Sequence, residues 1–127
     1  MMNDLIIPAT PFTPEIRFQY SKGYLEVGGE SYPENTSEFY QPVFQSLSAY
    51  LESLSNGEVT VMMRMRYFNS SSSKILINFF DLLEHAAKKG NTITVNWYYK
   101  DGDDDSREFG EEFSEDLQEI RFNILPE

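Results

Sequence analysis

Five stretches of the chain alternate apolar and polar residues with a period of two, the pattern of half-buried β-strands. They cover residues 16–20, 24–27, 59–68, 92–99 and 120–124. In the longest, 59–68, the odd positions from Val59 to Tyr67 form an apolar face, and the even positions, which include two arginines and Phe68, form the other. The polar turn at 21–23 predicts that the first two strands form a hairpin.

Three helices are predicted between these strands. Asn35 followed by Glu38 has the spacing of an N-cap and capping box, and apolar residues then recur at helical spacing to Leu54. Pro42 cannot donate to the carbonyl of Glu38, so we expect a kink or a delayed helix start there. A second helix is expected over 75–89, and a short acidic one presents Phe109, Phe113 and Leu117 on one side. The buried stripe of the second helix is expected to comprise Ile75, Leu76, Phe79, Leu82, Leu83 and Ala86.

Helices that alternate with strands favour parallel strand pairs whose crossovers lie on one side. The predicted strands are apolar on one face only, whereas a sheet covered on both faces has continuous apolar strands. We therefore predict an α/β fold with a two-layer, mostly one-sided mixed sheet. The open face is expected to carry Arg17, Arg64, Arg66 and Arg121. Residues 1–14, with three prolines, are expected to form an extended lead-in, and residues 1–127 a single domain.

The composition limits the classes of partner. The chain has 21 acidic and 10 basic residues and a net charge of −11, which disfavours nucleic acids and anionic membranes. It has no cysteine, which excludes disulfides and thiolate sites and is typical of a reducing compartment. The N-terminus lacks a signal-peptide pattern, and no apolar run approaches the length that spans a bilayer. We expect a cytoplasmic protein.

Candidate catalytic groups are few. His85 is the only histidine, which leaves no histidine pair for a metal or relay, and no glycine-rich phosphate loop is present. Asp101, Asp103, Asp105 and Glu112 match four positions of the calcium-loop spacing, but Ser106 stands where glycine is required. A solvated acidic turn and helix is the better interpretation. We predict neither an enzyme nor a bound metal or cofactor, and keep calcium binding as a lesser alternative.

The four consecutive serines Ser70–Ser73 lie between a predicted strand and a predicted helix. They have two interpretations of equal weight. In the first, Asn69 or a serine caps the helix and has no further role. In the second, one serine is phosphorylated, since a helix N-terminus with Lys74 nearby stabilises a phosphate. A phosphate adds about −1.5 to −2 charges to such a surface.

The motifs of the chain resemble the SiaC family of bacterial regulatory phosphoproteins. The resemblance rests on the start Leu5–Thr10 with its nearby Thr13-Pro14, the turn Ser31-Tyr32-Pro33-Glu34-Asn35, the junction Tyr67–Lys74, and the segments Phe80–Glu84 and Asn96–Tyr99. It covers nearly the whole chain, and the combined turn and junction are its most specific part.

The resemblance implies a fold similar to STAS-domain anti-anti-sigma factors and a role in a partner switch. Such proteins are phosphorylated by a dedicated kinase, dephosphorylated by a PP2C-type phosphatase, and bind an effector, a diguanylate cyclase in the SiaC system, when unphosphorylated. The phosphoacceptor threonine of the family falls on Ser70, and Ser71 is the alternative. Asn69 and Lys74 would support the phosphosite. Part of the partner surface would be formed by Tyr32, Pro33, Glu34 and Asn35, although this turn equally fits a rigid helix lead-in.

An alternative function remains: a small acidic interaction or oligomerising domain without phosphorylation. The two differ in what Ser70→Asp does, because only the switch predicts loss of partner binding. The sequence does not decide the oligomeric state.

Overall fold

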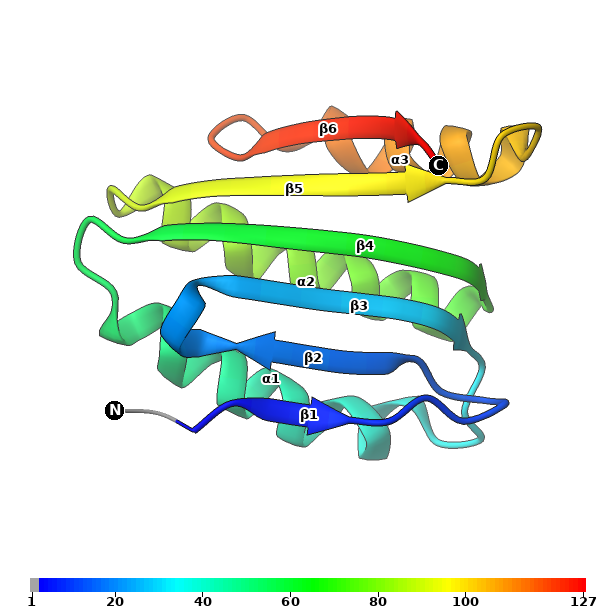
Figure 1. The fold of residues 1–127 in the computed structure, drawn as a ribbon, viewed down its shortest axis with the longest axis horizontal. Coiled ribbons are helices and arrows are strands. Elements are labelled where there is room, and N and C mark those ends of the chain that lie inside the picture. The colour runs from blue at the N-terminus through cyan, green and yellow to red at the C-terminus, as the bar shows by residue number, and fades with distance from the viewer. Residues whose placement is uncertain (1–2) are drawn as a thin grey trace.

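The computed structural model describes residues 3–127, in which six strands form one sheet and three α-helices pack on one of its faces (Figure 1). The strands lie in chain order across the sheet. The elements are β1 (Leu5–Ile7), β2 (Glu15–Gln19), a 3-10 turn (Tyr20–Lys22), β3 (Tyr24–Ser31), α1 (Thr36–Ser53), β4 (Glu58–Phe68), α2 (Ser70–Lys88), β5 (Thr92–Tyr99), α3 (Asp104–Glu115) and β6 (Arg121–Pro126).

The sheet is mixed. β1, β2 and β3 pair antiparallel, whereas β3–β4, β4–β5 and β5–β6 are parallel. Each parallel pair is joined by a helix, because parallel neighbours need a long crossover. The helices lie behind the sheet in Figure 1 and leave its other face uncovered. The prediction of a one-sided, two-layer mixed sheet is confirmed.

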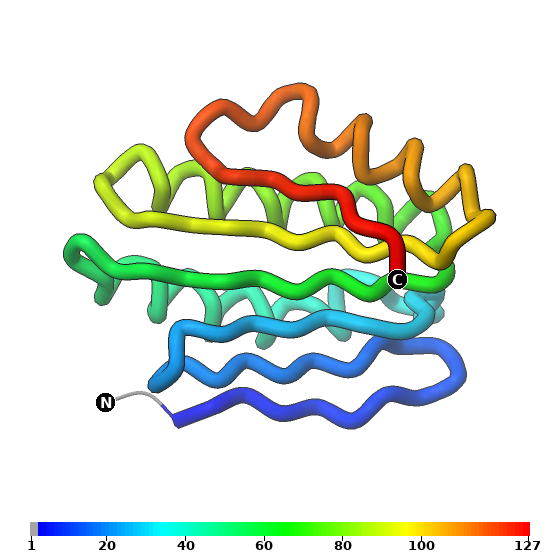
Figure 2. The backbone as a smooth tube through the Cα atoms, turned by 45° about the horizontal axis from the view of Figure 1, so that its top comes forward, coloured from blue at the N-terminus to red at the C-terminus, as the bar shows by residue number. Residues whose placement is uncertain are grey.

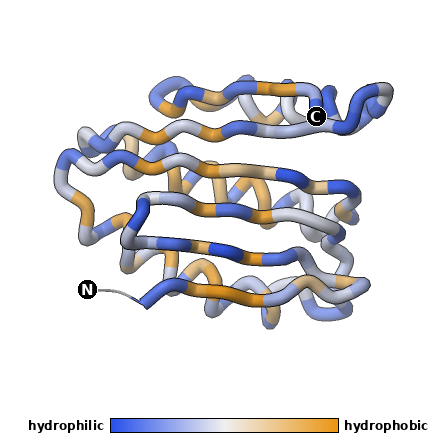
Figure 3. The backbone as a smooth tube through the Cα atoms, in the orientation of Figure 1, coloured by the Kyte–Doolittle hydropathy of each residue, from blue (hydrophilic) through white to orange (hydrophobic). Residues whose placement is uncertain are grey.

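The core lies between the covered face and the helices. Its largest fully buried side chains include Trp97, Phe18, Phe80, Leu47 and Leu83. Apolar and polar colours alternate along the strands in Figure 3, as expected for a sheet with one face buried. Helix α2 buries two apolar residues beyond the predicted stripe, Phe80 and Ala87, and two polar ones, Ser72 and Glu84, whereas Ile75 and Leu82 are only partly buried.

The structure corrects the prediction for the lead-in and excludes the delayed helix start, one of the two outcomes expected at Pro42. Within the predicted extended lead-in, Leu5–Ile7 is a strand of the sheet, and it pairs with β2 so that Leu5 lies opposite Phe18. Three residues between polar and proline-rich flanks are too few to show an alternation. Helix α1 begins at Thr36 and continues through Pro42, so its start is not delayed. Pro42 is exposed, and the cap at Asn35 fixes the start of the helix upstream of it.

The three helices begin at one edge of the sheet, where β3, β4 and β5 end (Figure 2). Each start has a side-chain cap that accepts from the backbone N–H three residues later. The cap distances are 3.0 Å for Asn35 to Glu38 N, 2.9 Å for Asn69 to Ser72 N, and 3.0 Å for Asp103 to Ser106 N. These caps place the tetraserine and the Tyr32–Asn35 turn at the same edge.

Candidate functional site

The junction between β4 and α2 is a single residue, Asn69. The predicted helix start at residue 75 is wrong, because α2 begins at Ser70. The serines have low intrinsic helix propensity but suit the first turn, where unpaired N–H groups need partners. Asn69 supplies one of these partners, because its side chain accepts from Ser72 N, and its carbonyl accepts the first intrahelical hydrogen bond, from Ser73 N at 2.9 Å. The whole tetraserine is therefore the first turn of α2.

The four serines differ in exposure because successive helical residues point in different directions. Ser70 and Ser71 are exposed, Ser73 is partly buried, and Ser72 is fully buried. A modifying enzyme therefore has access to the hydroxyls of Ser70 and Ser71 and not to that of Ser72.

Ser72 belongs to a buried polar cluster that joins three elements. Its Oγ lies 2.7 Å from Ser31 Oγ at the end of β3, and Ser31 Oγ lies 2.6 Å from the hydroxyl of Tyr40 on α1. Burial raises the pKa of Tyr40, against the opposing effect of its hydrogen bond with Ser31, so its hydroxyl is neutral. The cluster fixes the first turn of α2 against β3 and α1, and thereby the position of Ser70 and Ser71.

The Tyr32–Asn35 turn lies next to the serines. The carbonyl of Ser31, the residue before the turn, accepts from Asn69 N at 3.1 Å. Glu34 and Asn35 line the same open polar depression, about 520 Å³, as Ser71 and Lys74. Lys74 follows Ser70 by four positions and Ser71 by three, and both spacings bring side chains together on a helix. The structure thus brings all the predicted site residues into one region.

A strand irregularity exchanges the faces of two residues that the alternation pattern misplaced. Gly29 pairs with Met65 but Glu30 pairs with Tyr67, so Arg66 is an extra, bulged residue in β4. The shift reverses the alternation: Tyr67, predicted on the apolar face, is 53% exposed. Phe68, predicted on the open face, packs against Trp97 with ring centroids 6.2 Å apart. Sequence periodicity carries no signal for such a bulge.

Tyr67 belongs to a row of three aromatic rings at the same edge. Tyr32 packs edge-on against both neighbours, with centroid distances of 5.6 Å to Phe12 and 5.7 Å to Tyr67. Phe12 is 56% exposed, in the loop between β1 and β2, and its carbonyl accepts from Tyr32 N at 2.8 Å. Phe12 and Tyr32 lie far apart in the sequence, and the pairing of β2 with both β1 and β3 brings the β1–β2 loop to the end of β3.

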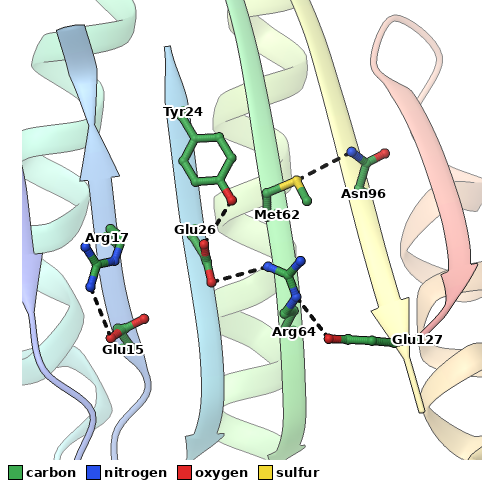
Figure 4. A network of polar contacts seen from close by, with 8 residues as sticks. All are labelled: Glu15, Arg17, Tyr24, Glu26, Met62, Arg64, Asn96 and Glu127. Atoms are coloured by element: carbon green, nitrogen blue, oxygen red, sulfur yellow. Dashed lines mark hydrogen bonds and ion pairs between the residues drawn. The ribbon is translucent and has the colours of Figure 1, made fainter. Parts of the chain in front are cut away.

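Of the four arginines predicted on the open sheet face, Arg17 and Arg64 form ion pairs. Arg64 contacts Glu26 at 3.3 Å and Glu127 at 3.1 Å, and its guanidinium lies 4.5 Å from the centre of the Tyr98 ring (Figure 4). Arg17 lies 3.7 Å from Glu15. Within residues 3–127, Arg66 and Arg121 form no ion pair.

The other candidate groups do not assemble into a centre. Helix α3 begins at Asp104, so most of the calcium-type spacing is helical and not a loop, and Asp103 is its N-cap. No group of three or more potential ligands is arranged for a metal in the part of the chain that the structure describes. His85 is exposed on α2. In residues 3–127 no helix is long and apolar enough to cross a membrane.

Comparisons with known proteins agree on one family. The model of the SiaC family regulatory phosphoproteins matches residues 7–127. An uncharacterised protein of Pseudomonas aeruginosa (strain UCBPP-PA14) is 35% identical over 117 residues, which cover 91% of this chain and 90% of that protein.

Two solved structures from Pseudomonas aeruginosa have the same fold. SiaC aligns with a TM-score of 0.90 and 33% identity, over 99% of this chain and 100% of that chain. A chain of the crystal structure of the diguanylate cyclase SiaD in complex with its activator SiaC gives a TM-score of 0.91 and 33% identity, over 98% and 100%. Fold and family model together define a bacterial regulatory phosphoprotein. The chain belongs to the SiaC family.

Proposed function

We propose that this protein is the phosphorylatable component of a cytoplasmic partner switch, acting as a single regulatory domain and not as a catalyst. A serine/threonine kinase modifies Ser70, a PP2C-type phosphatase restores it, and the unmodified form binds and activates an effector. A diguanylate cyclase is the effector we expect, because the relative SiaC is the activator of the cyclase SiaD in the complex described above.

The observation that carries the proposal is the exposure of Ser70 at the first position of α2, in a chain of a phosphoprotein family. The burial of Ser72 removes one competitor. A phosphate at Ser70 is stabilised by the positive end of the helix dipole and by Lys74 one turn later. Asn69 supports the site because its cap holds the first turn in place.

The experiment is quantitative affinity purification from the native host with wild-type protein and the variants Ser70→Ala and Ser70→Asp. We expect wild type and Ser70→Ala to retain the effector and Ser70→Asp to lose it, because the added charge mimics the phosphorylated form. Ser71→Asp is the matched control, with the same charge one residue further on. Equal recovery of the effector by Ser70→Asp and wild type contradicts the proposal.

A further inference from the structure

The Phe12, Tyr32 and Tyr67 side chains form an exposed apolar surface beside Ser70, here called the aromatic ledge. Phe12 and Tyr67 are more than half exposed, although edge-to-face packing against Tyr32 holds both rings in place. Folding gains little from leaving two large rings in water. Aromatic side chains in such positions are typical of the anchors of protein–protein contacts.

Two cations without an ion pair in the described part of the chain, Arg66 and Lys74, flank the ledge and the start of α2. Acidic residues outnumber basic ones by 21 to 10 in this chain, yet Arg66 and Lys74 form no ion pair within residues 3–127. Arg66 adjoins Tyr67 in β4, and Lys74 lies one helical turn after Ser70 in α2. Glu30 and Glu34 are exposed near the ledge, but neither reaches ion-pair distance of Arg66 or Lys74.

The β4 bulge leaves a cation and an aromatic ring exposed at adjacent positions of the sequence just before Ser70. In a regular strand without the bulge, Tyr67 would face the core on the same side as Met63 and Met65. With it, Arg66 and Tyr67 are both exposed just before Ser70. A bulge at the end of a strand commonly re-aims side chains next to a functional site.

We propose that the aromatic ledge docks a segment of the effector protein in which carboxylate side chains stand next to an apolar one. The apolar side chain packs on Phe12, Tyr32 and Tyr67, and the carboxylates pair with Arg66 and Lys74. This inference rests on the proposed function, which it extends by defining the chemistry of the partner. It also explains the switch: a phosphate on Ser70 pairs with Lys74 one turn later, repels the carboxylates and places charge beside an apolar contact.

The test is site-specific photo-crosslinking in the native host, with the full-length chain carrying p-benzoylphenylalanine in place of Tyr67. The matched control carries the same residue in place of Tyr24, an aromatic at the start of β3 and thus at the opposite end of the sheet from Ser70. We expect position 67, and not position 24, to crosslink the effector, and the crosslinked peptide to contain Asp or Glu.

Charge reversals then test the pairing. We expect Arg66→Glu and Lys74→Glu each to lower the yield of the adduct about tenfold, and Arg121→Glu to leave it within about twofold. Arg121 is the control because it too is exposed and makes no ion pair in the described part of the chain. Circular dichroism melts of the variants verify that each one folds.

Three results overturn the docking surface: an adduct at position 24 in place of 67, a crosslinked peptide without acidic residues, or an adduct that survives both reversals. These three results reject only the docking surface, and the proposed function still holds if effector recovery depends on Ser70. If no phosphorylated form and no Ser70-dependent partner exist, the proposed function itself fails, and the ledge has no effector to dock.

Discussion

Side-chain hydrogen bonds at the start of α2 decide which serine hydroxyls are accessible to a modifying enzyme. Asn69 caps the helix, and Ser72 is held by Ser31 in a fully buried position. Ser70 and Ser71 are left at the surface by the same arrangement. The chemistry of the four hydroxyls is identical, so their positions on the helix determine their roles.

The buried cluster predicts an asymmetric effect of two alanine substitutions. Ser72→Ala removes the buried hydroxyl that is hydrogen-bonded to Ser31 Oγ, which in turn is hydrogen-bonded to the Tyr40 hydroxyl. We expect this substitution to lower the free energy of unfolding by about 1–2 kcal/mol. Ser71→Ala alters an exposed hydroxyl and should stay within about 0.5 kcal/mol of wild type. Urea denaturation followed by circular dichroism measures both, and equal stability of the two variants would show that the cluster contributes nothing.

At the scale of elements, α3 depends on the absence of a side chain at Gly110. A Cβ built there would lie 2.7 Å from Cδ1 of Trp97, which is fully buried and donates from Nε1 to the carbonyl of Ser106 at 3.0 Å. Neither ring nor helix can move without breaking this contact. The helix therefore sits directly on the indole ring at the end of β5.

Gly110→Ala is expected to destabilise the protein by about 1 kcal/mol, because the cost of overpacking, about 1–3 kcal/mol, exceeds the gain of about 1 kcal/mol in helix propensity. The fluorescence of the only tryptophan reports the displacement directly during thermal unfolding. Glu108→Ala, an exposed change on the same helix, is the control and should leave the emission maximum unchanged. A stabilised Gly110→Ala variant would contradict the contact.

The elements of the fold were predictable where the pattern was long. Helix α1 with its Asn35 cap and strands β4 and β5 follow from periodicity, since one face of each is buried against the core. Strand β1 was missed because three residues carry no period. The start of α2 was placed five residues late because the capped first turn consists of serines, which disfavour helix interiors but suit helix ends.

The candidate site was predictable only in part. The capping role of Asn69 and the place of the serines beside it follow from a local pattern, whereas the assignment of Ser70 and of the Tyr32–Asn35 turn to the site rests on the family resemblance and stays a prediction. The aromatic ledge was missed: Phe12 reaches Tyr32 through strand pairing, and Tyr67 is exposed by a one-residue bulge that reverses the expected alternation. Contacts between residues distant in sequence are set by the assembled sheet, so no local pattern reveals them.

At the scale of the whole molecule, one buried carboxylate on α2 connects this helix to the segment that leads into β6. Glu84 on α2 is 7% exposed and accepts backbone N–H bonds of 2.9–3.1 Å from Gln118, Glu119 and Ile120, the segment that leads into β6. Burial alone would raise the pKa of this carboxyl, but the three N–H donors outweigh burial and lower it below its ordinary value of 4.5. The ionised form is therefore the one that folding stabilises.

The sign of this shift sets a pH dependence. The contribution of Glu84 is fully present above pH 4.5, its ordinary pKa, and is lost as the pH falls through the lower pKa of the folded state. We expect Glu84→Gln to lower stability at pH 7 by about 1–3 kcal/mol and to flatten the loss of stability below pH 4.5. Asp81→Asn, an exposed carboxylate on the same helix, is the control. Parallel stability–pH curves for wild type and Glu84→Gln would refute this role.

The central claim, that Ser70 is a phosphoacceptor, is tested most directly by the mass of the protein from its native host. Intact mass spectrometry across several growth conditions, followed by fragmentation, detects and locates a phosphoryl group. The account predicts one phosphoryl group on Ser70 that disappears in Ser70→Ala and persists in Ser71→Ala. An unmodified protein under every condition, or a phosphate that remains in Ser70→Ala, would contradict it.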